Sequence, residues 1–429
     1  MKRIICVILI MCTIFLLMSC NSNNLSPEVP QNGQPETETP IAPDESLENE
    51  AEDVEISEVP NESDNWRIAI VINEVSGNEE EFRTAEAMQR IFGEDRIVHK
   101  VWPMMFAQEG EMMISLMQEI AADPEIRAVI INQAVINTNA AVDALLAIRD
   151  DMFIVYASAA ENAQKVAVRA SVVLDLNNPM RGEAIVMQAL EMGAENIVHI
   201  SFPRHMGVPI LALRRDNMRI AAEREGINFV EIFAPDPMGD GGVPATQLYI
   251  NQEIPRQVEM HGQNTAFFAT NCAMMVPLIS QVMETGAMFI DPCCPSPYHG
   301  YPTAMRLDAF VPSGEVTVND EEIMRMVTLP ELIDLARAAV AEADMTGRIS
   351  AVPVAQSMLM TAMGTKYAIR WINGEVDKDI IDLDVLAEIG REFILEETGE
   401  DAGVMLEILS IDGHVYPNFI LTVMDYIVL

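Results

Sequence analysis

Between residues 66 and 290 the sequence alternates short, continuously apolar runs with longer segments of helical spacing. The first run, 67–72, is rich in β-branched residues, which is typical of a strand buried on both faces. Residues 79–92 follow with apolar side chains at helical intervals and are closed by Gly93. Predicted strands begin about every 30 residues, which is the length of one βαβ unit. This repeat predicts an α/β fold built from parallel sheets with right-handed crossovers.

The repeat runs through two cycles, which predicts two lobes. Residues 66–178 form the first lobe and residues 179–290 the second, each a doubly wound parallel sheet, and a hinge joins them. After residue 290 the periodicity weakens, and the remaining chain is too short for a third complete sheet. We expect part of 291–350 to complete the first lobe and part of 351–429 to complete the second.

Residues 1–19 have the pattern of an export signal. Lys2 and Arg3 precede an apolar run of about 15 residues, which is shorter than the roughly 20 residues that a membrane-spanning helix needs. The run ends in Leu-Met-Ser-Cys at 17–20, which resembles the lipobox of bacterial lipoproteins. We therefore expect Cys20 to become the lipidated first residue of the mature chain. A short buried helix and an uncleaved anchor are the alternatives.

Residues 20–65 predict a disordered acidic tether that begins at the lipidated Cys20. From Asn21 to Asn65 there are 13 acidic residues, six prolines and neither Lys nor Arg. Such a segment cannot bury enough apolar surface to offset the entropy of ordering, and its like charges extend it. The protein is therefore expected to be exported and held by its lipid in the bacterial cell envelope, with the folded body raised above the membrane.

The whole chain is strongly acidic, with 66 Asp and Glu against 26 Lys and Arg and a formal net charge of −40. Nucleic acid is excluded as a partner because phosphate binding needs a basic surface. Attachment to anionic lipid through a polybasic face is excluded for the same reason. The phosphate-loop, HExxH, EF-hand and GxSxG patterns do not occur in the sequence, so we expect no cofactor.

Candidate ligand-binding residues follow the predicted strands, because ligands of open parallel sheets bind beyond the carboxyl ends of the strands. Most are small or hydrogen-bonding side chains, which suits a sugar, a nucleoside or an amino-acid-like molecule. Arg204 could pair with a ligand carboxylate or with an acidic neighbour, and Tyr298 could stack on a sugar ring or pack at a lobe edge. The others could equally be ordinary turn residues. The candidates are Asn73, Ser76, Gln133, Ser158, Arg204, His205, Asp236, Asn271, Asp291 and Tyr298.

Three cysteines lie in the body of the chain: Cys272, Cys293 and Cys294. Together with His205 and His299 they could bind zinc or copper if the last two strand exits lay side by side. Adjacent cysteines fit a tetrahedral metal poorly, and no CxxC spacing occurs. Free buried thiols, or one disulfide from Cys272 to a later partner, are therefore the favoured interpretation, and no metal is assigned.

Four stretches of the body resemble a group of bacterial lipoproteins of unknown function that is related to type I periplasmic binding proteins. They are GAENIVHISFPRH at 193–205, FVEIFAPDP at 229–237, TAFFATNCA at 265–273 and CCPSPYHG at 293–300. The resemblance covers about residues 66–429. It implies a type I periplasmic-binding-protein-like fold and a solute-binding role, and it brings no established ligand or catalytic residue.

These features predict a membrane-anchored solute-binding lipoprotein. It would capture a small polar molecule between its lobes and deliver it to the permease of an ABC-type transporter. Two alternatives stay open. One is an envelope enzyme that uses the cysteines as a thiol or metal centre, and the other is a ligand-sensing receptor without transport. A binding protein is favoured over an enzyme.

Overall fold

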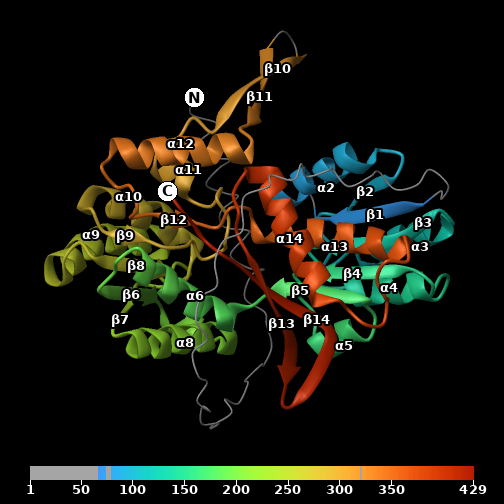
Figure 1. The fold of residues 1–429 in the computed structure, drawn as a ribbon, viewed down its shortest axis with the longest axis horizontal. Coiled ribbons are helices and arrows are strands. Elements are labelled where there is room, and N and C mark those ends of the chain that lie inside the picture. The colour runs from blue at the N-terminus through green and yellow to red at the C-terminus, as the bar shows by residue number, and fades with distance from the viewer. Residues whose placement is uncertain (1–65, 74–78, 319–320) are drawn as a thin grey trace, which may run out of the picture.

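The computed structural model describes residues 66–73, 79–318 and 321–429, so the predicted signal, Cys20 and the tether lie outside the described residues. Two α/β lobes lie side by side (Figure 1). Each lobe has a mainly parallel sheet with helices on both faces. The predicted fold class, two doubly wound parallel-sheet lobes, is confirmed.

The first lobe contains a seven-stranded sheet in the order β13-β14-β5-β4-β3-β1-β2. Its strand pairs are parallel except β13 and β14, which form an antiparallel hairpin at one edge. Ile68 and Ile70 of β1 face one layer of helices, whereas Ala69 and Val71 face the other. The strands are β1 (Arg67–Ile72), β2 (Ile97–Val101), β3 (Ile126–Asn132), β4 (Phe153–Ala157), β5 (Val172–Leu176), β13 (Val404–Ile411) and β14 (His414–Met424).

Two layers of helices cover this sheet. Gly364 allows α13 to approach it closely, because a Cβ at that position would lie 2.8 Å from Val155 Cγ1. The layer that includes α13 consists of α2 (Glu79–Phe92), α13 (Gln356–Ile372) and α14 (Leu383–Thr398). The opposite layer consists of α3 (Gly110–Ala122), α4 (Thr138–Leu146) and α5 (Ala163–Ala167).

The second lobe contains a four-stranded parallel sheet in the order β7-β6-β8-β9. The strands are β6 (Asn196–Ser201), β7 (Asn228–Phe233), β8 (Thr265–Ala269) and β9 (Met288–Phe289). One face is covered by α6 (Asn178–Glu191) and α8 (Pro209–Glu225), and the other by α9 (Gly242–His261), α10 (Met275–Thr285) and α12 (Leu329–Glu342).

Short elements complete the second lobe. The strands β12 (Ser350–Ala351) and β15 (Ile427–Val428) pair with each other. The antiparallel strands β10 (Phe310–Val318) and β11 (Glu321–Met326) project from the lobe near α12 (Figure 1). The remaining short helices are α7 (Pro203–Met206), η1 (Cys272–Met274) and α11 (Tyr301–Ala304).

The region after residue 290 is divided between the lobes differently from our expectation. Residues 291–350 belong mainly to the second lobe, where α12 packs Ile333 and Val340 into the core. Residues 351–424 complete the first lobe through α13, α14 and the β13–β14 hairpin. The final strand β15 lies in the second lobe, as expected. The prediction was wrong for most of this region because amphipathic spacing shows that a helix has a buried face but not which sheet covers it.

Within the described residues the chain passes between the lobes three times: between β5 and α6, between β12 and α13, and between β14 and β15. Hydrogen bonds hold these crossings together. The Asn177 N–H donates to the Thr422 carbonyl oxygen over 3.0 Å, and the Gln356 side-chain amide donates to the Thr422 hydroxyl. The crossings therefore form one narrow connection, which is where a hinge motion would take place.

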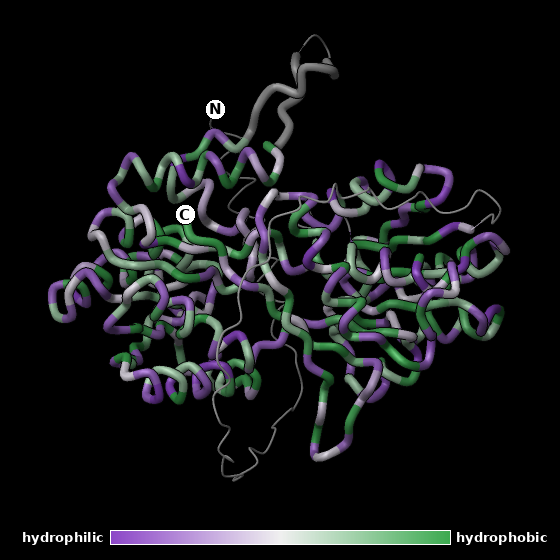
Figure 2. Tube along the Cα trace, viewed as in Figure 1, coloured by the Kyte–Doolittle hydropathy of each residue, from purple (hydrophilic) through white to green (hydrophobic). Residues whose placement is uncertain are grey.

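Figure 2 shows apolar segments concentrated in the sheets of both lobes and hydrophilic segments mainly on the outer helices. This distribution agrees with strands buried on both faces. In the part of the chain that the structure describes, no helix has both the length and the apolar character needed to cross a bilayer.

His199 of β6 is a buried polar residue in the middle of the second sheet. Its ring lies between Phe229 and Phe268, with ring centroids 6.2 and 6.1 Å away. Neither ring nitrogen has a hydrogen-bond partner among the described residues. Burial, with smaller contributions from Arg214 and Arg215, lowers the pKa of His199 to about 3. The folded protein therefore keeps this imidazole neutral, whereas the unfolded chain takes up a proton below about pH 6.5.

Replacing His199 should change how the free energy of unfolding depends on pH. Protonation of His199 in the unfolded state lowers the free energy of unfolding by about 2 kcal/mol between neutral pH and pH 5. His199→Phe should remove that contribution, which urea denaturation at pH 7.5 and pH 5 measures. His414→Ala, at an exposed histidine, is the matched control. If His199→Phe had the same pH dependence as the wild type, His199 would not be the buried neutral imidazole described here.

Candidate functional site

The two lobes meet where α2 of the first lobe contacts the loop after β9 of the second. Glu80 of α2 accepts a hydrogen bond from the hydroxyl of Ser296, and Ser357 of α13 donates to the same carboxylate over 3.5 Å. Burial raises the pKa of Glu80 to about 7, although the hydrogen bond from Ser296 acts in the opposite direction. The junction therefore contains a carboxyl group that changes its protonation near neutral pH.

A chain of amide and carboxylate groups continues from this junction across the carboxyl ends of the first sheet. Asn73 follows β1, and its Nδ2 donates to Oε1 of Gln133 over 3.3 Å. The Nε2 of Gln133, which follows β3, donates to Oε1 of Glu81 over 3.1 Å. Asn73 Oδ1 accepts no hydrogen bond from the described residues. The predicted residues Asn73 and Gln133 are thus in contact, and Glu81 joins them from α2.

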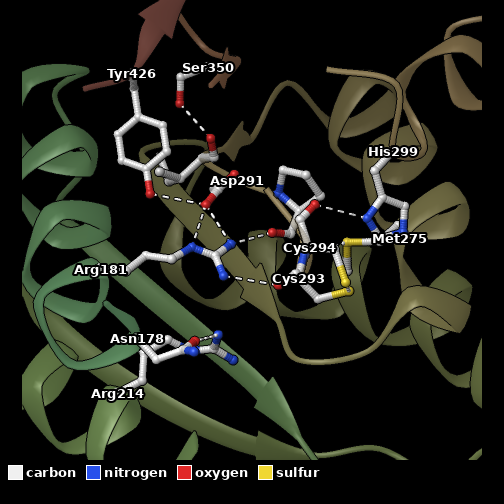
Figure 3. Close-up of polar contacts among 12 residues, drawn as sticks. Asn178, Arg181, Arg214, Met275, Asp291, Cys293, Cys294, His299, Ser350 and Tyr426 are labelled. Atoms are coloured by element: carbon white, nitrogen blue, oxygen red, sulfur yellow. Dashed lines mark hydrogen bonds and ion pairs between the residues drawn. The ribbon is translucent and has the colours of Figure 1, made fainter. Parts of the chain in front are cut away.

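Three thiols and one imidazole converge at the end of the second sheet that faces the junction. Figure 3 shows three of these residues, Cys293, Cys294 and His299. Two sulfur–sulfur distances are 3.8 Å, Cys272–Cys294 and Cys293–Cys294, and the distance from Cys272 to Cys293 is 3.3 Å. All four candidate ligand atoms lie within 4.8 Å of one another. Hydrogen bonds from Cys272 and Cys293 lower the pKa of Cys294 well below its usual range. The thiol–imidazole cluster consists of Cys272, Cys293, Cys294 and His299.

Local backbone structure explains why these side chains meet. β8 and β9 are adjacent parallel strands, so the residues that follow them leave the sheet side by side. Cys272 begins η1 after β8, and Cys293 and Cys294 follow β9. Gly300 has φ +91°, and a Cβ there would lie 3.1 Å from Met275 Cβ, so glycine permits the His299 loop to turn against α10.

A buried ion pair holds the loop that carries the adjacent cysteines. The Arg181 guanidinium of α6 donates to Oδ2 of Asp291 over 2.8 Å from Nε and 2.5 Å from Nη2. It also donates to the carbonyl oxygens of Pro292 and Cys293. Tyr426, on the last crossing between the lobes, donates to the same Asp291 oxygen over 3.0 Å. One guanidinium therefore links α6, the third crossing and the cysteine loop (Figure 3).

A second buried arginine lies close to this pair. Arg214 of α8 is 2% exposed and donates to Asn178 Oδ1 over 2.9 Å, while its Nε has no hydrogen-bond partner among the described residues. Burial, followed by repulsion from Arg181, lowers the pKa of Arg214 to about 9. The surroundings of the cysteine loop are therefore electropositive, which favours anionic groups there.

The other predicted ligand residues of the second lobe bond with protein groups. Arg204 forms a bidentate ion pair with Asp236, with N–O distances of 2.8 and 2.9 Å. His205 is buried, and its Nδ1 lies 3.2 Å from Thr270 Oγ1, so it lies outside the thiol–imidazole cluster. Asn271 Oδ1 accepts from the N–H of Ala273 and caps η1.

Among the remaining predicted residues, Tyr298 contacts the junction, because its backbone N–H donates to Ser296 Oγ over 3.1 Å. Ser158 follows β4, and its backbone N–H donates to the Leu174 carbonyl oxygen over 3.0 Å. Tyr298 is partly buried and packs against the core of the first lobe. Ser76 lies outside the described residues.

Sequence reasoning missed several residues of the junction. Glu80 and Glu81 belong to the run Glu79–Glu81 at the start of a helix that follows a predicted strand exit, and this acidic run could have signalled them. Nothing in the local sequence distinguishes Ser296, Arg181 or Tyr426, whose partners are up to 216 residues away in the chain.

Loss of the buried guanidinium should destabilise the fold strongly. Arg181→Met leaves Asp291 charged and buried, which should lower the free energy of unfolding by about 3–5 kcal/mol. Arg204→Met breaks a partly exposed pair, and the expected loss is under about 1 kcal/mol. Urea denaturation compares the two variants, and equal losses would contradict a special structural role for Arg181.

Comparisons with known proteins agree with this architecture. The family model described as "Protein of unknown function (DUF3798)" matches residues 66–350. An uncharacterized protein of Treponema pallidum (strain Nichols) is 32% identical over 174 residues, which are 41% of this chain and 81% of that protein.

A crystal structure of a candidate transcriptional regulator from Clostridium difficile 630 has a TM-score of 0.73 at 18% identity and covers 85% of this chain and 99% of its own. A sugar ABC transporter structure from Actinomyces odontolyticus ATCC 17982 is more distant, with a TM-score of 0.46 at 8% identity, covering 72% of this chain and 84% of its own. The chain shares the fold of the Clostridium difficile protein and belongs to the DUF3798 family of proteins of unknown function.

Proposed function

We propose that this protein is an exported solute-binding lipoprotein that holds a small polar ligand between its two lobes. The observation that supports the proposal is the junction itself, where the carboxyl ends of both sheets contribute polar side chains to one place. Glu80 of the first lobe contacts Ser296 of the second, and the chain Asn73–Gln133–Glu81 lies beside it. In open parallel sheets this is where ligands bind.

Binding would work through closure of the lobes. A ligand shifts a hinge equilibrium only by as much as it binds the closed state more tightly than the open one. Groups supplied by both lobes provide that difference, because both sets contact the ligand only when the lobes are together. The three hydrogen-bonded crossings at Asn177, Gln356 and Thr422 form the hinge in this proposal.

The side chains at the junction indicate the ligand's chemistry. Carboxylate and amide oxygens of Glu81, Gln133 and Asn73 accept hydrogen bonds, and the amide nitrogens donate them. Hydroxyl and amino groups satisfy such a surface, so we propose a sugar, a nucleoside or an amino-acid-like molecule. The partner that receives the ligand would be the permease of an ABC-type transporter.

Binding should appear as a thermal shift. We expect at least one compound from a panel of sugars, nucleosides and amino acids to raise the melting temperature by several degrees. Gln133→Ala should abolish the shift, because it removes the central link of the amide–carboxylate chain, whereas Gln118→Ala on the exposed face of α3 should keep it. The unliganded melting temperature of each variant establishes that it is folded. A folded protein that responds to no class of compound would count against the proposal.

Anchoring through Cys20 makes a separate prediction. Cys20→Ser should move the protein from the detergent-soluble membrane fraction to the aqueous fraction and abolish incorporation of radiolabelled fatty acid, because the lipid is attached to that sulfur. Cys272→Ser is the matched control and should remain membrane-bound. Unchanged fractionation and labelling of Cys20→Ser would show that the lipobox assignment is wrong.

A further inference from the structure

We propose that the thiol–imidazole cluster at the lobe junction binds a thiophilic metal ion, with Zn²⁺ as the best fit. The proposal goes beyond solute binding and is independent of it, since the four residues belong to one lobe. It also departs from the sequence-based interpretation, which favoured free thiols or one disulfide.

Two of the three sulfur–sulfur distances agree with tetrahedral coordination. A zinc ion about 2.3 Å from two thiolates holds those sulfurs about 3.8 Å apart at the tetrahedral angle. The pairs Cys272–Cys294 and Cys293–Cys294 are 3.8 Å apart, and the third pair is 3.3 Å apart. The adjacent cysteines therefore both direct their sulfurs toward Cys272, which removes the objection drawn from their sequence.

The orientation of His299 completes the donor set. Its Nδ1 lies 3.1 Å from the carbonyl oxygen of Cys294. A carbonyl can only accept, so Nδ1 carries a proton, and in the neutral imidazole that binds a metal the lone pair is on Nε2. Metal-bound histidines commonly donate their second ring nitrogen to a backbone carbonyl in this way.

The surrounding charges suit a metal–thiolate centre. Zn²⁺ with three thiolates and a neutral imidazole has one net negative charge. Arg181, Arg214 and Asp291 together contribute one net positive charge beside it, and Arg214 forms no ion pair with a carboxylate among those identified in the described residues. Burying Arg214 without such a pair is costly, and a neighbouring anionic centre offsets that cost.

Contacts behind the ligands fix their positions. Arg181 donates to the Cys293 carbonyl oxygen over 2.9 Å, and the Cys293 N–H lies 3.4 Å from Met275 Sδ. Four protein ligands fill a tetrahedral shell, which is typical of structural zinc rather than of a catalytic ion with an open position. We therefore infer that the ion holds the segment after β8 against the segment after β9. The second-lobe side of the junction is then more rigid.

A disulfide is the competing outcome. Cys272 and Cys293 are the closest pair, but a disulfide requires sulfurs about 2.05 Å apart and would leave Cys294 and His299 without a role. In an oxidising compartment the two outcomes exclude each other, because a metal ligand must be a thiolate.

The test uses the full chain carrying Cys20→Ser, purified with reductant, stripped of metal and titrated with Zn²⁺ against a chromophoric chelator. We expect one Zn²⁺ per chain and a higher melting temperature with the ion bound. Co²⁺ should give the intense absorption of a tetrahedral thiolate site. Cys272→Ser and His299→Ala should each weaken Zn²⁺ binding at least about 100-fold, since each removes a ligand that contacts the ion directly. His414→Ala should bind normally, because His414 is exposed at the start of β14, in the other lobe.

Three results would overturn the proposal. The first is no stoichiometric Zn²⁺ binding by reduced protein whose circular dichroism shows it folded. The second is wild-type affinity in both ligand variants, which marks binding elsewhere. The third is a disulfide among the three cysteines, found by mass spectrometry in protein taken from the envelope without reductant. Each result leaves the thermal-shift test of solute binding unaffected, so the two proposals fail separately.

Discussion

The buried ion pair between Arg181 and Asp291 is the interaction on which the arrangement of this protein depends. Removing both charges from water is expensive, and hydrogen bonds must satisfy the remaining donor groups of the guanidinium. Arg181 achieves this by donating to Asp291, to Pro292 and to Cys293, while Tyr426 adds a donor to the same carboxylate. The pair thereby joins a helix of the second lobe, the loop after β9 and the last crossing between the lobes.

This linkage couples the hinge to the chemistry of the junction. The loop that Arg181 holds carries Cys293 and Cys294 and continues to Ser296, which contacts Glu80 of the other lobe. A change in the angle between the lobes must therefore alter the Glu80–Ser296 contact while the cysteine loop stays fixed to α6. In this account the second lobe supplies a rigid surface and the first lobe moves against it.

The sequence was most informative about features that depend on local pattern. Apolar runs such as 67–72 predicted strands buried on both faces, and the 30-residue repeat predicted two parallel-sheet lobes. The assignment of the last third of the chain was mostly wrong because α12 and α13 are both amphipathic, and their sequences do not reveal which sheet they cover. Which sheet a helix packs against, when the two lie more than 200 residues apart in the chain, is decided by the assembled fold and not by the local sequence.

In the candidate site, too, local sequence pattern predicted some features, whereas others depend on the assembled structure. The candidates Asn73 and Gln133 are in contact, because the parallel strands that precede them end at the same side of the sheet; their role in binding stays a prediction. Whether Arg204 faced a ligand or Asp236 depended on side-chain geometry that spacing does not encode. The cysteines were judged unsuitable for a metal from their adjacency, whereas the turn after β9 directs both sulfurs toward Cys272.

The central claim is that the junction between the lobes is a binding site. Native mass spectrometry of protein isolated gently from the cells that produce it tests this claim most directly. It measures the mass of the folded chain together with any ion or molecule bound to it. The account predicts masses above that of the polypeptide with its covalent modifications by one metal ion and, in a ligand-loaded fraction, by one small organic molecule. A folded protein without either added mass, in every preparation, would contradict it.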